Sequence, residues 1–565
     1  MKVFLATLFL YLSLSATAQE TDPNWERPEG EIDDAEVVIE KEREISLPTA
    51  SRRFEPIPPL PISQPTTSVA YQFQEVTPRL PALNPQVRPL KIVPPPLDPL
   101  YGNYTKLGFG NFLTPYAELF ANNTRNDEYS YGLHLQHESS RFGPVDGANS
   151  GNSDSRLGVS SKYFTQGHTF RAKASYQRER YHFYGYSPST EPEPERDSIR
   201  QIFNSIAVSA GIAQADADAP LDYDVEAQFT HLNDAYQAAE NQVNLHLKAY
   251  YTVLPHITLG LASDLYLMRR SDQSPETMTE SSLGRSLFRA RPYLTYRSSD
   301  GPGEGLTITG GFTIAHENDT ASNADQLHVY PYALATLHLD DALQVYAGID
   351  GDIEATSLYS FTRENPYLEA DVPLLHTNRN FSFRGGTKGR INSLFGFHLG
   401  FSASNYKNLY FFANSARDST RFTILYDSDN VFQLNLFGEL SLNSTERFRS
   451  SLRGDFYTYN VENVEEPWHR PNFTLSWLNR LNLFEKILLN AELQFMSGIQ
   501  GINLASGTIR QLDPITDLHF QADYLFSSRF SAFVEVRNIF AQNYERFMNY
   551  PSRGLMVLGG VTYSF

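Results

Sequence analysis

The sequence predicts an all-β fold, a transmembrane antiparallel β-barrel of about 22 strands (range about 16 to 22) preceded by an extended Pro-rich segment. Three observations lead to this fold class. From about Tyr101 to the C-terminus, apolar and polar residues alternate with a period of two. Aromatic residues make up 13% of the chain, yet no apolar run beyond the first few residues is long enough for a transmembrane helix. Short and long connections also follow each other along the chain, as on the two rims of such a barrel.

The N-terminus predicts an export signal. Residues 1–18 combine a basic second residue, an apolar stretch and a small-x-small cleavage site that ends at Ala18. The apolar stretch is too short to cross a hydrocarbon core of about 30 Å, which disfavours a permanent membrane anchor. Cleavage would place Gln19 first in the mature chain, and since this residue is not cysteine, a lipoprotein is not expected.

Residues 19–100 differ from the rest of the chain. They begin with an acidic stretch and continue with 14 prolines between Pro48 and Pro99. Proline lacks a backbone donor and favours extended polyproline II, so this arm is expected to be largely without regular structure. We expect the arm to lie in the periplasm. Two interpretations stay open: a disordered linker, or a strap that binds a periplasmic or outer-membrane protein partner or folds back into the pore.

Residues 101–565 form the predicted barrel. In "LHFQADYLF" (residues 518–526) apolar side chains share one face, and charged or amide side chains share the other. The same division recurs in "LLNAELQF" (residues 488–495), where Leu493 and Glu492 fall on opposite faces. A soluble sandwich also alternates, but its strands average about five or six residues. The segments here run for about 10 to 15 residues, and strands of at least about 9 to 11 residues with aromatic girdles are typical of a transmembrane barrel.

The connections support the same fold. Short links such as "TQGH" and "VLPH" alternate with long ones such as "YSPSTEPEPERDS" and "RRSDQSPETMTESSLG". Outer-membrane barrels have short periplasmic turns on one rim and long extracellular loops on the other. An even strand total places both ends of the barrel in the periplasm. Strand pairing is least defined near residues 104–124 and 405–430.

Charge and cysteine content exclude several functions. The net charge of −19 disfavours a nucleic-acid partner, because binding a polyanion requires a basic surface. The chain has no cysteine, which excludes disulfides, thiolate metal sites and cysteine nucleophiles. Neither a cofactor nor a metal site is predicted.

The C-terminus carries a recognisable set of motifs. It contains an Asn-aliphatic-Phe turn, a Tyr-Glu pair, a Pro-x-Arg-Gly element and a final aromatic-x-Phe: Asn538–Phe540, Tyr544–Glu545, Pro551–Gly554 and Tyr563–Phe565. Residues 533–565 thereby resemble the last hairpin of TonB-dependent outer-membrane receptors. The resemblance implies that Tyr563 and Phe565 belong to the signal read by the barrel-assembly machinery, and that the barrel lies in outer-membrane lipid.

The N-terminus departs from that family. TonB-dependent receptors carry a globular plug of well over a hundred residues before the barrel, whereas only residues 19–100 precede it here and they are Pro-rich. We therefore expect a receptor-like barrel that lacks the plug.

Charged residues on the predicted lumen face are the candidates for a site. Arg289, Arg291 and Arg297 share one face of "SLFRARPYLTYR", and Asp350 and Asp352 share a face of a later strand. The arginines are candidates for an anion-attracting ladder in the lumen. The alternative, which we favour, is that they pair with acidic side chains on adjacent strands.

Two classes of function remain. The first is a barrel for solute passage, or a barrel subunit of a larger envelope complex, without enzymatic activity. The alternative is a membrane-embedded hydrolase, a lipase or protease. A hydrolase would lose activity on substitution of one rim Ser or Asp, whereas a pore would tolerate any single such change.

Overall fold

The computed structural model describes residues 100–187, 192–216, 219–273, 280–298, 305–319, 324–340, 342–443 and 447–565, together with Gln72 and Gln74. The chain divides into two compact units, Met1–Pro94 and Pro95–Phe565. The predicted signal peptide lies outside the described residues, as does the predicted arm apart from Gln72, Gln74 and Leu100. No helix in the described part of the chain is long and apolar enough to cross a membrane.

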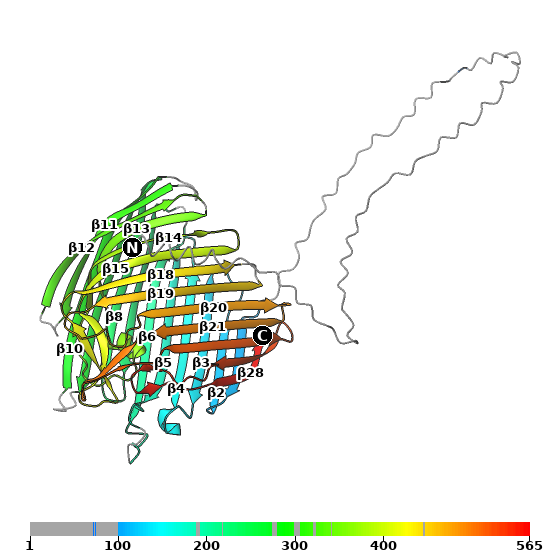
Figure 1. The fold of residues 1–565 in the computed structure, drawn as a ribbon. Coiled ribbons are helices and arrows are strands. Elements are labelled where there is room, and N and C mark those ends of the chain that lie inside the picture. The colour runs from blue at the N-terminus through cyan, green and yellow to red at the C-terminus, as the bar shows by residue number, and fades with distance from the viewer. Residues whose placement is uncertain are drawn as a thin grey trace, which may run out of the picture. The chain divides into compact units, whose positions relative to one another are not determined.

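The second unit is a closed antiparallel barrel of 22 strands (Figure 1). Its strands are β1 (Asn103–Gly110), β2 (Thr114–Asn122), β3 (Tyr129–Ser140), β4 (Asn152–Phe164), β5 (His168–His182), β6 (Arg200–Gln214), β7 (Leu221–Asn233), β8 (Ala239–Leu254), β9 (Ile257–Gln273), β10 (Glu280–Arg297), β11 (Gly305–Asp319), β12 (Ala324–His338), β13 (Leu343–Glu354), β14 (Thr377–Arg390), β15 (Phe395–Lys407), β18 (Val431–Asn443), β19 (Phe448–Asn460), β20 (Phe473–Leu483), β21 (Ile487–Ser497), β24 (Ile515–Leu525), β25 (Phe530–Arg537) and β28 (Met556–Ser564). The predicted fold class and strand number are confirmed.

The last strand closes the barrel against the first. β28 pairs with β1 in antiparallel register from Tyr104 opposite Ser564 to Gly110 opposite Leu558. Beyond this register, Asn103 and Phe565 exchange two backbone hydrogen bonds, of 3.1 and 3.0 Å. The closed sheet has no free edge, so its backbone groups find partners without water, as a lipid environment requires.

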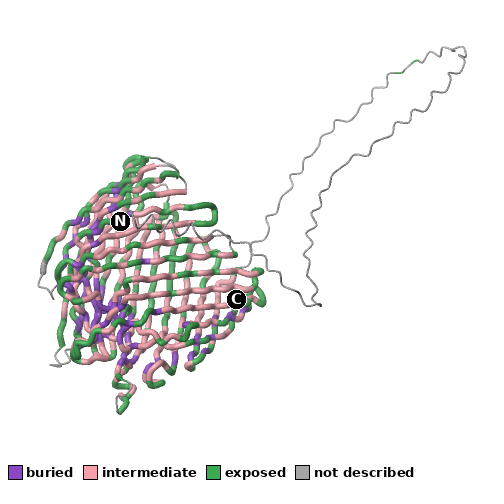
Figure 2. Tube along the Cα trace, in the orientation of Figure 1, coloured by how far each residue is buried: buried purple, intermediate pink, exposed green. Residues whose placement is uncertain are grey.

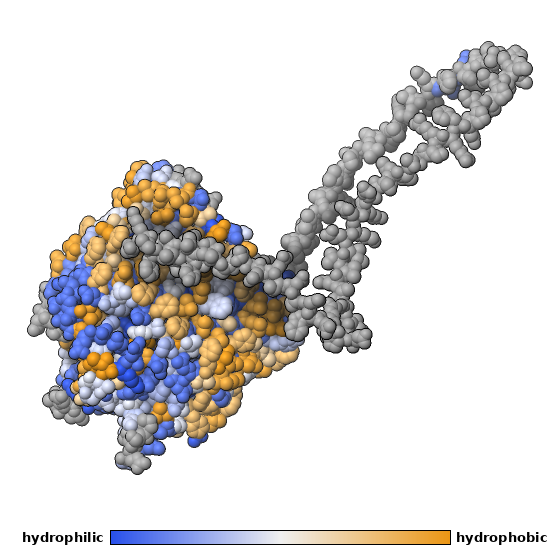
Figure 3. Space-filling view, viewed as in Figure 1, coloured by the Kyte–Doolittle hydropathy of each residue, from blue (hydrophilic) through white to orange (hydrophobic). Residues whose placement is uncertain are grey.

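The period-two pattern sorts side chains between lipid and lumen. On β10, Phe288 and Leu294 face outward and are 41% and 42% exposed, whereas Leu287 faces inward and is fully buried. In Figure 3 the outer wall near β20, β21 and β28 is mostly apolar, and the end that carries the long loops is mostly polar. Alternating hydrophobicity along each strand therefore produces the two-sided wall.

The two rims of the barrel differ. One rim has turns of a few residues, as between β20 and β21, and we call it the short-turn rim. The other, the long-loop rim, carries long connections and the short helices η1 (Gly147–Ser150) and α2 (Leu358–Glu364). β9 and β10 have 17 and 18 residues, more than the about 9 to 11 that cross a bilayer, so they extend beyond it at this rim.

Two small sheets are separate from the 22-stranded barrel sheet. β16 (Leu409–Asn414), β17 (Phe422–Asp427), β22 (Gln500–Asn503) and β23 (Thr508–Gln511) form one, and β26 (Glu545–Phe547) with β27 (Tyr550–Pro551) forms the other. Residues 405–430, where the sequence left the pairing least defined, therefore contain a hairpin of the long-loop rim and not two barrel strands. At six residues each, β16 and β17 are too short to cross a membrane.

The facing of β21 gives a first prediction. Leu493 lies opposite Trp477 and Leu518 on the lipid face, whereas Glu492 lines a recess in the lumen wall. A charge on the lipid face at the bilayer midplane costs about 2 to 4 kcal/mol, so Leu493→Arg is expected to impair barrel assembly. The neighbouring Glu492→Arg is expected to assemble normally, as measured by the heat-dependent mobility of the barrel in SDS gels. Normal assembly of Leu493→Arg together with failure of Glu492→Arg would mean that the facing is inverted.

Candidate functional site: a lumen closed by a cap

Five loops of the long-loop rim pack together over the lumen. These loops, residues 355–376, 408–430, 461–472, 498–514 and 538–555, are called the cap below. Apolar side chains from three of these loops, with three from β6, β7 and the connection after β7, form one buried cluster: Phe203, Leu232, Ala238, Leu358, Phe361, Leu368, Val372, Leu374, Phe412, Phe422, Ile424, Phe547 and Tyr550. Figure 2 shows buried residues concentrated toward the end that carries these loops. The cap therefore has a core of the kind found inside soluble domains.

Three tyrosines join two loops of the cap to the connection that follows β5. The rings of Tyr367 and Tyr550 stack with centroids 3.6 Å apart, and Tyr184 contacts Tyr550 edge-on at 4.9 Å. Tyr184 follows β5, Tyr367 lies between β13 and β14, and Tyr550 lies between β25 and β28, so this cluster spans the mouth of the barrel. Burial raises the pKa of Tyr367 and Tyr550 well above the ordinary value, which keeps both hydroxyls protonated.

A buried carboxylate fixes the first loop of the cap to the wall. Ser357 caps the N-terminus of α2 and accepts from the backbone N–H of Ser360, as the Ser-x-x-Ser spacing allows. The first two N–H groups of the helix, those of Leu358 and Tyr359, donate to the carboxylate of Glu240 on β8 at 2.9 and 3.1 Å. Glu240 is 2% exposed, so water does not stabilise its carboxylate. The two N–H donors at the N-terminus of the helix do so instead.

A buried ion pair holds the same loop further along. Arg270 and Asp272 of β9 form a salt bridge in which both side chains are almost fully buried. Arg270 also donates to the carbonyl oxygen of Val372 at 2.5 Å, and the backbone N–H of Asp371 donates to Asp272 at 3.0 Å. Charged side chains of the strand thereby provide hydrogen-bond partners for the backbone C=O and N–H groups of the loop.

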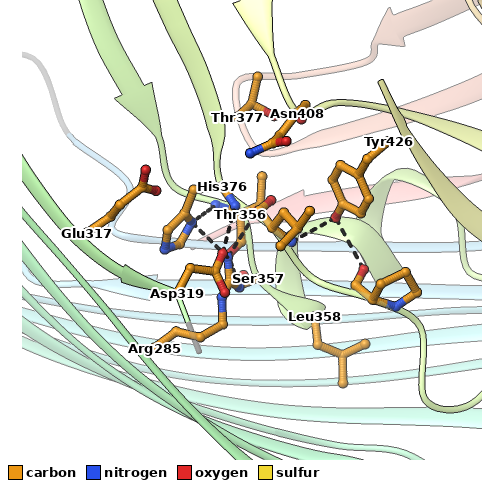
Figure 4. Close-up of polar contacts among 12 residues, drawn as sticks. Arg285, Glu317, Asp319, Thr356, Ser357, Leu358, His376, Thr377, Asn408 and Tyr426 are labelled. Atoms are coloured by element: carbon orange, nitrogen blue, oxygen red, sulfur yellow. Dashed lines mark hydrogen bonds and ion pairs between the residues drawn. The ribbon is translucent and has the colours of Figure 1, made fainter. Parts of the chain in front are cut away.

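A third anchor surrounds His376 (Figure 4). Arg285 of β10 donates to the Thr356 carbonyl oxygen and to His376 Nδ1, both at 2.9 Å, and pairs with Asp319 of β11 at 3.4 Å. Because Nδ1 of His376 accepts a hydrogen bond, this imidazole is neutral. Burial and the adjacent arginine lower the pKa of His376 well below its ordinary value. The Tyr426 hydroxyl accepts from the backbone N–H of Leu375 at 3.0 Å and joins β17 to the same loop.

His469 connects three loops of the cap. Its Nδ1–H donates to the carbonyl oxygen of Phe412 at 2.7 Å, and its Nε2 accepts from the backbone N–H of Met548 at 3.2 Å. These two contacts require the neutral imidazole with its proton on Nδ1. Burial, with a smaller contribution from Arg546 and Arg510, lowers the pKa of His469 to about 4.

The lumen wall below the cap carries the arginines singled out in the sequence. Arg289 forms ion pairs with Asp264 at 2.9 Å and with Asp352 at 3.4 Å. Arg291 pairs with Asp352 at 3.1 Å and donates to Thr313 at 2.8 Å. Arg289, Arg291 and Asp352 are thus in one network.

The other predicted lumen residues lie apart from this network. A register shift between Asp350 and Asp352 separates the two carboxylates, and Asp350 contacts Arg379 at 3.6 Å and Arg384 at 3.9 Å. Arg297 is exposed at the short-turn end of β10.

The predicted assembly signal lies at the closing strand. Tyr563 and Phe565 are 46% and 50% exposed, and their rings stack with centroids 5.5 Å apart. This position fits an aromatic girdle at the short-turn rim, next to the pairing with β1. Whether the assembly machinery reads these residues stays a prediction.

Sequence reasoning did not find the cap. The sequence pattern did not indicate the residues that hold the cap in place, because each contacts a segment far away in the chain. These residues are Glu240, Arg285, His376 and His469. A signal was present in residues 409–427, where two aromatic-rich segments are too short to span a membrane and had to pack elsewhere.

The hydrolase alternative requires a histidine placed between a serine hydroxyl and a carboxylate. Both ring nitrogens of His137 contact serine hydroxyls, Ser155 at 2.8 Å and Ser139 at 3.1 Å, so a carboxylate does not orient this histidine as a triad requires. Within the same residues, no group of three His, Asp or Glu side chains could hold a metal ion.

The barrel is similar to several solved structures. The siderophore receptor PirA from Acinetobacter baumannii matches with a TM-score of 0.61 and 12% identity, over 82% of this chain and 80% of that one. The ferric-catecholate import receptor Fiu from E. coli K12 matches with a TM-score of 0.59 and 10% identity, over 82% of each chain. The FrpB iron transporter from Neisseria meningitidis matches with a TM-score of 0.63 and 9% identity, over 83% and 82%. No family model and no curated protein sequence matches this chain.

The chain has the barrel fold of TonB-dependent receptors. The resemblance inferred from residues 533–565 is confirmed at the level of the fold. The fold and its neighbours point to the outer membrane. These neighbours are transport receptors and not enzymes. The expected absence of a plug concerns residues 19–99, which lie outside the described residues apart from Gln72 and Gln74.

The tautomer of His469 predicts a pH-dependent cap. The closed cap requires neutral His469, whose pKa is about 4 in the cap and about 6.5 when the loops separate and water reaches it. The closed cap is therefore fully stable above about pH 6.5, and loses about 3 kcal/mol as the pH falls to about 4. Proteolysis of the cap loops in the purified protein is expected to accelerate between pH 7 and pH 5. His469→Gln, which retains one donor and one acceptor, should show a shallower pH dependence, and an unchanged dependence would contradict the assignment.

Proposed function

We propose that this chain is a transport-type outer-membrane receptor barrel that is closed by its own extracellular cap, and that a solute passes through the lumen when the cap opens. The observation that carries the proposal is a cap with an apolar core above a lumen lined by charged side chains. A barrel of 22 strands encloses a lumen too wide for wall side chains to fill, so a closure at the mouth is needed to prevent a leak.

The N-terminal arm has a separate role in this proposal. Residues 1–18 are the signal peptide, and residues 19–100 form a periplasmic arm in place of a plug. With the mouth closed by the cap, the arm is not needed to seal the pore. In this proposal the arm binds a periplasmic or outer-membrane partner.

A second candidate is a barrel subunit of a larger envelope complex. The packing of the cap favours it, because side chains such as Phe361 and Phe422 are 1% and 0% exposed and separating them would be costly. In this case the cap stays closed and the arm holds the complex together.

Planar-bilayer conductance tests whether the cap closes the pore. Phe422→Ala leaves a cavity in the centre of the cap that costs about 3 to 5 kcal/mol, so we expect frequent large openings where the unmodified barrel stays closed. Phe484→Ala removes the same ring from a turn on the short-turn rim, where it is 86% exposed, and should stay closed. Closed channels in both variants would argue against the cap as the gate and favour the subunit role.

Removing residues 19–100 behind a retained signal tests the arm. We expect the barrel to insert with the heat-dependent SDS mobility of the full chain, because its strands close without the arm. Conductance should not change, and a protein that co-purifies with the full chain from detergent-solubilised membranes should be lost. A large conductance in the truncated protein alone would instead make the arm the closure of the pore.

A further inference from the structure

A recess in the lumen wall differs in charge from the network around Arg289. It lies on β12 to β15 and β18 below the cap and has a volume of about 570 Å³. Arg379, Arg384 and Lys388 line it, and its lining contains no carboxylate. In a chain with a net charge of −19, three cations at one recess are a local reversal of sign.

The two arginines of this recess keep free hydrogen-bonding capacity. Arg384 has one ion pair among the described residues, with Asp350 at 3.9 Å. Arg379 lies 3.6 Å from Asp350 and 3.8 Å from Glu354. These distances exceed those of hydrogen bonds. The Nε–H of Arg379 is buried, so the terminal N–H groups are those left for a ligand. Asp350 is 4% exposed and lies behind the arginines, where it positions them.

Several other arginines of the barrel lack this capacity. Arg171 and Arg537 form hydrogen-bonded ion pairs with Asp224 and Glu138. Arg453, next to the recess, donates twice to Asp455 at 2.9 and 3.0 Å. Arg379 and Arg384 are thus unlike arginines whose role is to balance a neighbouring carboxylate.

An aromatic floor adjoins the cations. The Tyr346 hydroxyl contacts His398 Nε2 at 2.9 Å, and the rings of His398 and Phe437 meet edge-on with centroids 4.9 Å apart. Gly386 and Gly400 let these rings lie against the wall, because an added Cβ would come within 2.6 Å of the Tyr346 hydroxyl and 2.7 Å of Phe437. Phe437 sits on the otherwise polar lumen face of β18.

We propose that this recess binds an organic oxyanion, a phosphate or carboxylate group joined to a flat apolar group. The guanidinium groups of Arg379 and Arg384 and the ammonium group of Lys388 take the anion, since charged N–H groups match oxyanions. Tyr346 and Phe437 contact the apolar part. This ligand class would be the solute that passes through the lumen in the function proposed above. The role of the site in transport rests on that proposed function, whereas the binding of the anion does not.

Calorimetric titration of the full-length barrel in detergent tests the site. The probes are phenyl phosphate, inorganic phosphate, and benzylamine as a cation with the same ring. We expect phenyl phosphate to bind most tightly, inorganic phosphate more weakly and benzylamine not at all. Binding should weaken at high salt, because the contacts are ionic.

Variants assign the binding to this recess. Arg384→Gln combined with Lys388→Gln should weaken phenyl phosphate binding by at least about tenfold. Phe437→Ala should reduce the preference for phenyl phosphate over inorganic phosphate. Arg156→Gln, on β4, removes a lumen charge that is paired with Asp154 at 2.6 Å and should bind within about twofold of the unmodified barrel. Heat-dependent SDS mobility checks that each variant is folded.

Equal binding by the double variant and the unmodified barrel, or no saturable binding of phenyl phosphate, would overturn the proposal. Conductance separates it from the proposed function. Binding without any opening of the Phe422→Ala barrel would leave the recess in place and overturn passage. Opening of the Phe422→Ala barrel without anion binding would support passage and overturn the anion site.

Discussion

A closed sheet of 22 strands gives each strand a hydrogen-bonded neighbour on both sides, as lipid requires, and in doing so creates a lumen that wall side chains cannot fill. The rest of the molecule follows from this constraint. The seam between β1 and β28 removes the last sheet edge, down to the paired backbones of Asn103 and Phe565. The open end then needs a closure, and in the proposed function the long loops provide it through a second, soluble-like core above the membrane wall.

That closure uses buried charge where a soluble core would use apolar contacts alone. Loop backbone at the mouth needs donors and acceptors, and the strands below it offer Glu240, Arg270 and Arg285. Each is paired or bonded to several groups, which offsets the cost of removing its charge from water. Removing one partner would leave the other charge buried and unpaired, so these anchors fix one arrangement of the loop between β13 and β14.

The fold could be predicted from the sequence and the cap could not. Alternation in residues 488–495 and 518–526 follows from local geometry, because side chains two residues apart must face the same side of a strand. Arg289 and Arg291 could be placed on the lumen face for the same reason. Glu240 and Leu358, however, meet across 118 positions of sequence, and no local period records such a contact. Residues 409–414 and 422–427 form strands as the wall segments do, but at six residues each they are too short to cross a membrane.

The cap also sets an order on assembly. Its buried cluster takes side chains from Phe203 to Tyr550, so the cluster is incomplete until the final hairpin has crossed the membrane. The loops that meet there must each be carried across before any of them has its partners. The terminal Phe565, at the seam of the wall, and Tyr550, in the buried cluster of the cap, belong to the same last hairpin, so the wall and the cap are completed together.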